Sequence, residues 1–257
     1  MTCDHVSVSH PAAGVLLVSF RRLPLKNALC TAMLQEIATI LDGAEGDDAV
    51  GAVVMTGGEV FAAGADLKEM SAKSAVDALL DPRAAAWRRI AQFPKPLLAA
   101  VNGFALGGGL ELAMHADIII AGSDARLGQP EVNFGIIPGA GGTQRLTQAV
   151  GKSLAMKMVL SGEIIDSGTA LRAGLVAEVV EPGRTVDRAV ELAARIAGKP
   201  RLAVRLAKEA VLQASDRALA AGMAFERQAF SMLFATEDRA EGTAAFLQKR
   251  KPVFRGR

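Results

Sequence analysis

Cysteine and histidine are scarce in this sequence of 257 residues, which contains two cysteines and three histidines. The two cysteines, Cys3 and Cys30, cannot form the disulfide framework of a small secreted protein. The histidines, at positions 5, 10 and 115, do not have the spacing of zinc ligands. The composition therefore favours a reducing compartment, for which we expect the cytoplasm, and it disfavours a catalytic zinc site.

Long hydrophobic runs are also lacking, although hydrophobic residues make up 51% of the chain. The apolar runs at 14–18 and 117–120 stop far short of the roughly 20 residues that span a bilayer, so we expect a soluble protein. The net charge of +2 argues against a protein that binds duplex nucleic acid. Positive charge is nevertheless concentrated at the C-terminus, on Lys249, Arg250, Lys251, Arg255 and Arg257. This group predicts either a solvated tail or a contact with an anionic ligand.

The first half of the chain alternates short β-rich runs with amphipathic stretches, which is the pattern of a layered α/β domain. We expect strands at 14–20, 50–56, 97–101 and 117–121. One helix should begin at Thr31, whose hydroxyl is a suitable cap, and another should cover 75–92, before Pro94. From about Gly141 onward the pattern is mostly helical, over 143–161, 185–197, 202–213 and 217–234, with one strand at 175–180.

Three glycine-rich stretches, at 61–66, 107–111 and 138–144, make nucleotide binding the first function to test. Gly151, Lys152 and Ser153 resemble the end of a phosphate-binding loop. That loop requires a glycine five residues before Gly151, where this chain has Leu146. No stretch supplies G-x-G-x-x-G after a strand either, so the sequence argues against nucleotide binding.

The middle glycine-rich stretch follows an expected strand and turn at 98–106 and precedes an apolar helix. Amide groups at a helix N-terminus lack partners within the helix, and the helix dipole is positive there, so negative charge is stabilised at that place. Glycine also allows a substrate carbonyl to come close. The stretch therefore predicts an oxyanion hole, in which one donor supplies about 3 to 4 kcal/mol of transition-state stabilisation; the alternative is a tightly packed turn.

Two glutamates lie near these glycines. Glu111 stands near the start of the expected helix, where surface glutamates are also common. Glu131 follows Pro130 in a turn-like segment framed by apolar residues, and such surroundings disfavour ionisation, which suits an acid or base near neutral pH. The alternative for Glu131 is a solvated loop position.

Together these segments resemble the crotonase (enoyl-CoA hydratase/isomerase) superfamily, from about Val15 to Phe254. Three motifs carry the likeness: FAAGADLKEM at 61–70, AAVNGFALGGGLELA at 99–113, and GQPE at 128–131 with IPGAGGTQRL at 137–146. The resemblance implies an α/β fold built as a spiral of ββα units. It places the catalytic core in residues 1–195 and a helical C-terminal region, which packs in a homotrimer or homohexamer, in residues 196–257.

The resemblance also implies an enoyl-CoA hydratase, a hydro-lyase that adds water across the C2–C3 double bond of a trans-2-enoyl-CoA to give a 3-hydroxyacyl-CoA. By position, the amides of Ala65 and Gly108 would hold the thioester oxygen. We expect Glu131 to protonate C2, while Glu111 orients and helps to deprotonate the water that attacks C3. The alternatives are a Δ3-Δ2 enoyl-CoA isomerase, or a non-catalytic protein of the same fold that binds RNA or another partner.

The expected ligand is an acyl-CoA thioester, and because coenzyme A is part of the substrate, no separate cofactor or metal is implied. By the same resemblance, further substrate or coenzyme A contacts are expected from Lys26, Ala28, Ala63, Asp66, Leu67, Lys68, Gly107, Pro130 and Gly139. One departure is visible, because Pro24 stands one position later than the family's usual Arg-Pro.

The acyl chain is not specified by these motifs. Its pocket should involve residues 72–90, Phe134 and Ile137, and Trp87 belongs either to this pocket or to the core. The segments 158–163, 235–239 and 246–250 are similar to hydratases of bacterial phenylacetate degradation. Fatty-acid β-oxidation stays open as the alternative pathway, because its short-chain hydratases would share most of the same residues.

Overall fold

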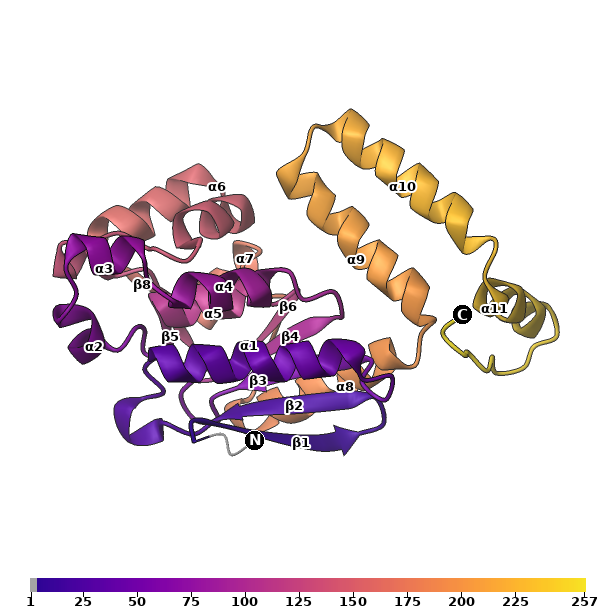
Figure 1. Ribbon diagram of the computed structural model, residues 1–257, viewed down its shortest axis with the longest axis horizontal. Coiled ribbons are helices and arrows are strands. Elements are labelled where there is room, and N and C mark those ends of the chain that lie inside the picture. Colours follow the sequence, from indigo (N-terminus) through magenta and orange to yellow (C-terminus); the bar gives the residue numbers. More distant parts are fainter. Residues whose placement is uncertain (1–3) are drawn as a thin grey trace.

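A computed structural model describes residues 4–257, so that Cys3 lies outside the described part of the chain. Figure 1 shows an α/β body followed by a helical C-terminal third. The strands are β1 (Val6–Ala12), β2 (Val15–Phe20), β3 (Ala52–Thr56), β4 (Leu97–Val101), β5 (Phe104–Leu106), β6 (Ile118–Gly122), β7 (Arg126–Gly128), β8 (Ile164–Asp166) and β9 (Glu178–Val180). The α-helices are α1 (Thr31–Gly46), α2 (Leu67–Ser71), α3 (Ala75–Leu79), α4 (Arg83–Ala91), α5 (Gly108–His115), α6 (Gly142–Ser161), α7 (Ser167–Arg172), α8 (Thr185–Ala197), α9 (Arg201–Asp216), α10 (Leu219–Leu233) and α11 (Glu237–Leu247). Three short 3-10 helices are η1 (Leu23–Leu25), η2 (Glu131–Phe134) and η3 (Pro182–Arg184).

The main sheet has six strands in the order β1-β2-β3-β4-β6-β9. β1 and β2 form an antiparallel hairpin, and every later pair in this sheet is parallel. Parallel neighbours need crossover connections, which here contain α1, α4 and α5. The carboxyl ends of β3, β4 and β6 therefore lie at one edge of the sheet, and the loops that follow them begin there.

Helices cover both faces of this sheet, because alternate residues of its strands point to opposite sides. Val53 and Met55 belong to the larger core, under α1, α4 and α5. Ala52 and Val54 belong to a second core, into which α8 inserts Ala189. Burial on both faces explains why β3 and β4 are continuous apolar runs rather than alternating ones.

A smaller sheet, β5-β7-β8, lies beside the main one and leads to the glycine-rich segments. Before β5, the chain segment around Ala62 runs parallel to that strand. The amide of Ala62 donates to Phe104 O at 2.9 Å, and Leu106 donates to Ala62 O at 3.1 Å. The first glycine-rich stretch is thereby fixed beside the strand that continues into the second.

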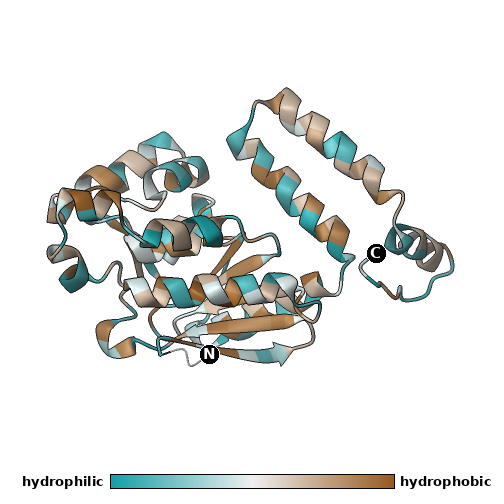
Figure 2. Cartoon of the chain, viewed as in Figure 1, coloured by the Kyte–Doolittle hydropathy of each residue, from teal (hydrophilic) through white to brown (hydrophobic). Residues whose placement is uncertain are grey.

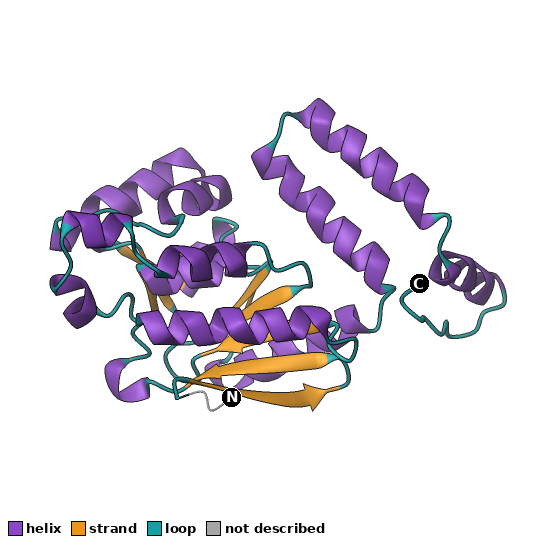
Figure 3. Ribbon diagram, in the orientation of Figure 1, coloured by secondary structure: helices purple, strands orange, loops and turns teal. Residues whose placement is uncertain are grey.

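After α8 the described chain contains helices joined and followed by loops, and no strand, as the purple and teal segments of Figure 3 show. α9 and α10 pack as an antiparallel pair that stands away from the sheet, with α11 beyond them (Figure 1). α9 is anchored to the α/β body through Lys208, which pairs with Asp117 at 2.8 Å and donates to the carbonyls of Phe93 and Lys95. The predicted division at residue 195 falls inside α8, and it stays a prediction.

The α/β class and the helical C-terminal region are confirmed, but several element predictions were wrong. The helix expected over 75–92 is divided into α3 and α4, because Pro82 disfavours helical geometry in Asp81. Only Glu178–Val180 of the strand expected at 175–180 pairs with a neighbour. The hydroxyl of Thr31 is bonded to Glu69 rather than capping α1, which has Cys30 at its N-cap.

Other segments were not predicted at all, including β1, the three-residue strands β5, β7 and β8, and α11. α6 was predicted almost to its ends, but its path changes direction at Gly151, which has φ of 76°. Among the described residues, no helix combines the length and the apolar character that a membrane crossing requires.

Candidate active site

The first and second glycine-rich stretches meet where β5 passes into α5. Gly107, the N-cap of α5, has φ of 49° and ψ of −125°, a conformation that residues with a Cβ rarely adopt. Its amide donates to Gly128 O at 2.9 Å, which holds the turn against β7. A Cβ built on Gly108 would lie 3.5 Å from the amide nitrogen of Ala65 and 3.9 Å from Glu111 Oε2. The two stretches and a carboxylate therefore surround one small space.

Two amide groups face this space without a protein acceptor. Within residues 4–257, neither the amide of Ala65 nor that of Gly108 donates a hydrogen bond. The two neighbours of Ala65 bond to Leu29 instead, because the amide of Asp66 donates to Leu29 O and the carbonyl of Gly64 accepts from Leu29 N. Gly108 is the first residue of α5, where the helix dipole adds positive potential. The pair has the donor arrangement of an oxyanion hole.

Gly109 shows why this turn is built from glycines. A Cβ at this position would lie 2.2 Å from the carbonyl oxygen of Ala62, well inside van der Waals contact with backbone. Only a residue without a side chain allows α5 to approach the first glycine-rich stretch so closely. The distance between the two candidate donors thus depends on Gly109.

Glu111 lies in the first turn of α5, and only 3% of the residue is exposed. Its Oε1 accepts hydrogen bonds from the amides of Ala140 (2.6 Å) and Gly142 (2.8 Å). Gly142 is the first residue of α6, so the carboxylate sits at the N-terminus of a second helix. Burial raises the pKa of Glu111 above its ordinary value, although these two hydrogen bonds favour the ionised form.

Glu131 is placed by η2, the short helix that follows β7. Burial, together with the negative charge of Glu111, raises the pKa of Glu131 to about 7. The carboxyl group also lies against the second glycine-rich stretch, because a Cβ on Gly107 would be 2.9 Å from Glu131 Oε1. A carboxyl group with this pKa exchanges its proton readily near neutral pH, as general acid–base catalysis requires.

Gln129 supports Glu131 through its side-chain amide. Its side chain is fully buried. With the amide oriented so that its nitrogen faces the acceptors, it donates to Glu131 Oε1 at 2.9 Å and Oε2 at 3.1 Å. A Cβ on Gly142 would be 2.9 Å from Glu111 Oε1 and 2.9 Å from the other atom of this amide, which is its oxygen in the same orientation. Gln129 therefore lies beside both glutamates and limits the rotation of Glu131.

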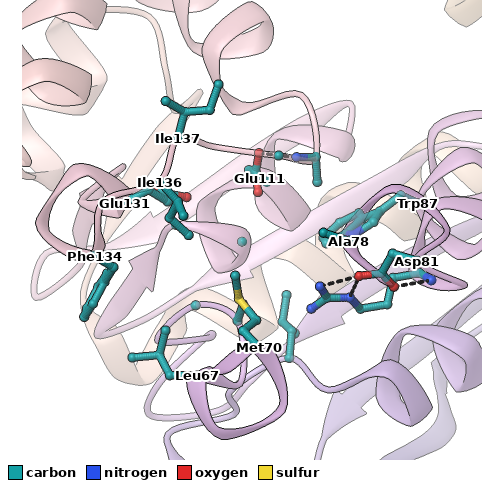
Figure 4. Close-up of a pocket in the computed structure, with 18 of the residues that line it drawn as sticks. Leu67, Met70, Ala78, Asp81, Trp87, Glu111, Glu131, Phe134, Ile136 and Ile137 are labelled. Atoms are coloured by element: carbon teal, nitrogen blue, oxygen red, sulfur yellow. Dashed lines mark hydrogen bonds and ion pairs between the residues drawn. The ribbon is translucent and has the colours of Figure 1, made fainter. Parts of the chain in front are cut away.

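These groups border a cavity of about 360 Å³. Figure 4 shows Glu111 near the middle of the pocket, Glu131 and Phe134 to one side of it, and Trp87 and Asp81 to the other. The remaining wall is mainly apolar and includes Leu29, Leu34, Leu67, Met70, Ala78, Ile136 and Ile137. An apolar cavity with a few convergent polar groups is the usual form of a small-molecule site.

Most of the residues predicted from the sequence meet at this cavity. Its wall includes Ala63, Ala65, Leu67, Gly107, Gly108, Glu111, Pro130, Glu131 and Gly139. The other four, Lys26, Ala28, Asp66 and Lys68, are absent from the wall. Asp66 instead caps α2 and pairs with Arg22 at 3.0 Å, while Lys26 lies over the ring of Phe104. The predicted ligand roles of all these residues stay predictions.

Trp87 lines the cavity, packs against the hydrophobic core and stacks on His115 with ring centroids 5.3 Å apart, so both roles predicted for it apply. Other contributors were not predicted from the sequence. The amides of Ala140 and Gly142 could not be singled out, because a backbone donor has no side-chain signature. Asp81 and Arg83 fall inside the range expected for the acyl pocket, but nothing in their spacing marked them.

Comparisons with known proteins agree with this arrangement. The family model described as enoyl-CoA hydratase/isomerase matches residues 10–257, and the chain belongs to that family. A 2,3-dehydroadipyl-CoA hydratase of Escherichia coli (strain K12) is 50% identical, over 95% of this chain and 96% of its own length. A mitochondrial enoyl-CoA hydratase of Pongo abelii is 47% identical, over 93% of this chain and 83% of its own length.

Solved structures show the same fold. An enoyl-CoA hydratase subunit I from Geobacillus kaustophilus HTA426 superposes with a TM-score of 0.95 at 42% identity, and 98% of each chain is covered. An enoyl-CoA hydratase from Bacillus anthracis has a TM-score of 0.93 at 36% identity, covering 99% of this chain and 100% of its own. The crotonase-like architecture expected from the sequence motifs is thereby confirmed.

Proposed function

We propose that this protein is an enoyl-CoA hydratase, which adds water to C3 and a proton to C2 of a trans-2-enoyl-CoA. The observation that carries the proposal is the placement, around one apolar cavity, of a buried and a half-buried carboxyl group and of two amides that have no acceptor within residues 4–257. Family membership and the names of relatives support the same reaction. In this proposal the reacting groups come from the chain, the thioester and one water molecule, and no metal or nicotinamide takes part.

The thioester oxygen would bind between the amides of Ala65 and Gly108. The β-carbon of a 2-enoyl thioester is electrophilic only to the extent that this oxygen accepts negative charge. Two donors fixed before the reaction stabilise the enolate-like transition state, and removing one such donor costs about 3 to 4 kcal/mol in well-studied enzymes. α5 adds its dipole at the same point.

The two glutamates would divide the proton transfers. The amides of Ala140 and Gly142 donate to Glu111 and favour its ionised form, so we assign it to orient the water and accept its proton. Glu131, whose pKa is raised to about 7, is partly protonated near neutral pH, and we assign it to protonate C2. After one turnover Glu111 has gained the proton that Glu131 has lost, and exchange with solvent restores both.

An isotope experiment separates hydration from the isomerase alternative. Crotonyl-CoA incubated with the protein in H2-18O should lose its enoyl absorbance and yield 3-hydroxybutyryl-CoA labelled at the hydroxyl. A Δ3-Δ2 isomerase would instead convert a 3-enoyl-CoA to the 2-enoyl-CoA without taking up solvent oxygen. If folded protein isomerises a 3-enoyl-CoA but incorporates no 18O into any product, the proposed hydration is excluded.

The proposal extends to the oligomeric state, the cellular compartment and the metabolic pathway. We propose a homotrimer or homohexamer in the cytoplasm, with substrates either from fatty-acid β-oxidation or from phenylacetate degradation. Large apolar side chains are exposed on the C-terminal helices: Val211, Leu219, Met223, Phe230, Met232, Phe246 and Leu247. Figure 2 shows such hydrophobic residues in brown along α9 and α10. Light scattering would measure the oligomeric state, and a monomer at micromolar concentration would exclude the proposed trimer or hexamer.

A further inference from the structure

One charged pair lines the cavity in addition to the two glutamates. Among the described cavity-lining residues, Asp81 and Arg83 are the only other ionisable side chains. Both stand at the break between α3 and α4, where Asp81 Oδ1 accepts from the backbone amide of Arg83 at 2.9 Å. The proline between them produces this turn, and the turn places both side chains on the same wall.

The pair uses only one edge of the arginine. Nε and Nη2 of Arg83 donate to Asp81 Oδ2 at 2.9 and 2.6 Å. Within residues 4–257, Nη1 of Arg83 has no hydrogen-bond acceptor. A guanidinium group carries five N–H donors in a planar fork, so the edge formed by Nη1 and Nη2 can still receive a second carboxylate.

Asp81 holds this guanidinium in a fixed orientation. Only 12% of the Asp81 side chain and 14% of the Arg83 side chain are exposed. Lys73, which does not line the cavity, donates to the same Asp81 oxygen at 2.8 Å. Burial alone would raise the pKa of Asp81, but hydrogen bonds from Arg83 and Lys73 lower it, so the carboxylate is ionised at neutral pH. The free edge of Arg83 is thus supported by a charged partner behind it.

The pair lies across Glu111 from Leu67. Figure 4 shows Asp81, Ala78 and Trp87 on one side of Glu111, and Leu67 on the other. The coenzyme A contacts predicted at Leu67 and Lys68 would place the coenzyme on that second side. The acyl chain of a thioester held at Glu111 then runs in the opposite direction, along the apolar surface of Trp87 and Ala78, toward Asp81 and Arg83.

We propose that the free edge of Arg83 binds a carboxylate at the far end of the acyl chain. The substrates of highest specificity are then 2-enoyl-CoA thioesters of dicarboxylic acids. This inference rests on the proposed hydratase function and adds a substrate class to it. An unpaired arginine edge in an apolar cavity favours an anionic group, because a methyl end would leave its donors without an acceptor.

Two six-carbon substrates test the inference, because 2,3-dehydroadipyl-CoA and trans-2-hexenoyl-CoA differ only in a terminal carboxylate or methyl group. The wild-type protein should show a higher kcat/KM for the dicarboxylic substrate. Replacing Arg83 by methionine should lower the ratio of the two kcat/KM values at least about tenfold, the usual effect of losing a hydrogen bond to a charged group. The ratio within each variant cancels any general loss of activity.

A matched control uses the same helix. Arg88 of α4 is exposed and absent from the cavity wall, and Arg88→Met removes the same charge by the same substitution. Its substrate ratio should equal that of the wild type. The inference is overturned if wild-type protein hydrates trans-2-hexenoyl-CoA as efficiently as the dicarboxylic substrate, or if Arg83→Met keeps the wild-type ratio.

Binding of saturated analogues distinguishes this inference from the function on which it rests. Calorimetry with adipyl-CoA and hexanoyl-CoA involves no hydration, and adipyl-CoA should bind the wild type more tightly but lose that preference in Arg83→Met. If the wild type hydrates neither enoyl substrate, the hydratase proposal fails, while the calorimetric preference still tests Arg83. Equal affinities for the two analogues would overturn the Arg83 site alone.

Discussion

The pH dependence of hydration should report the protonation of Glu131. Its pKa is about 7, against 4.5 for an ordinary glutamate. At pH 8 a group of pKa 7 is protonated in about 9% of molecules and one of pKa 4.5 in about 0.03%, so burial gives an approximately 300-fold larger population of the acid. The general acid is therefore present in useful amounts at the pH of a cell.

Because the protonated form of Glu131 is the proposed acid, activity should decrease as pH rises through its pKa. We expect kcat/KM for crotonyl-CoA to decrease tenfold per pH unit on the alkaline side, to about one hundredth of its plateau at pH 9. Activity should also decrease on the acid side, where Glu111 becomes protonated. Because burial raises the pKa of Glu111, this decrease should begin at a higher pH than the pKa of an ordinary glutamate would give. Initial rates of the loss of enoyl absorbance, taken from pH 5 to pH 9, measure both the acid-side and the alkaline-side decrease.

Two variants make this result specific. Glu131→Gln should be slower by about 10²- to 10⁴-fold and should lose the alkaline decrease near pH 7. Glu59→Gln removes an exposed glutamate without a side-chain hydrogen bond within residues 4–257, and it should keep the wild-type profile. A wild-type kcat/KM that is constant between pH 6 and 9 would refute the assignment of Glu131 as the acid.

Two further predictions concern the helix that carries Glu111. Gly109→Ala places a Cβ 2.2 Å from Ala62 O, so we expect a loss of about 1 to 3 kcal/mol in unfolding free energy and a lower kcat; an unchanged denaturation midpoint would contradict the close packing. Burial first, and Arg145 second, lower the pKa of His115 to about 4 from 6.5. The stabilisation that comes from keeping this ring neutral is fully present above pH 6.5. As the pH falls from 6.5 to 4, the free energy of unfolding should decrease by about 1.4 kcal/mol per pH unit. In His115→Gln this part of the pH dependence should vanish, and urea unfolding at pH 4.5 and 7 measures it.

The sequence allowed the α/β class and the core strands to be predicted because their apolar runs are long enough to be recognised. Strands β5, β7 and β8 have three residues each, too few for an alternating pattern to appear. The division of the 75–92 segment depends on Pro82, whose effect on Asp81 was visible in principle. The same effect of proline on the preceding residue correctly predicted that the segment ends before Pro94.

The candidate site was predicted well where a motif carried it and poorly where only contacts define it. Glu111, Glu131, Ala65 and Gly108 belong to recognisable motifs, and the chain folds so that they share one cavity. Asp81 and Arg83 are tied to the site by packing between segments far apart in the sequence, which no local pattern reveals. Lys26 and Lys68 are exposed, so any coenzyme A contacts they make lie at the surface.

In the proposed reaction, two carboxyl groups act together on one water molecule and one double bond. The most direct measurement is the rate of crotonyl-CoA hydration by Glu111→Gln, Glu131→Gln and the double variant, each shown to be folded by circular dichroism. We expect each single variant to lose about 10²-fold or more in rate, and the double variant to be little slower than the slower single one, because the pair acts as a unit. A folded single variant that hydrates crotonyl-CoA at the wild-type rate would contradict it.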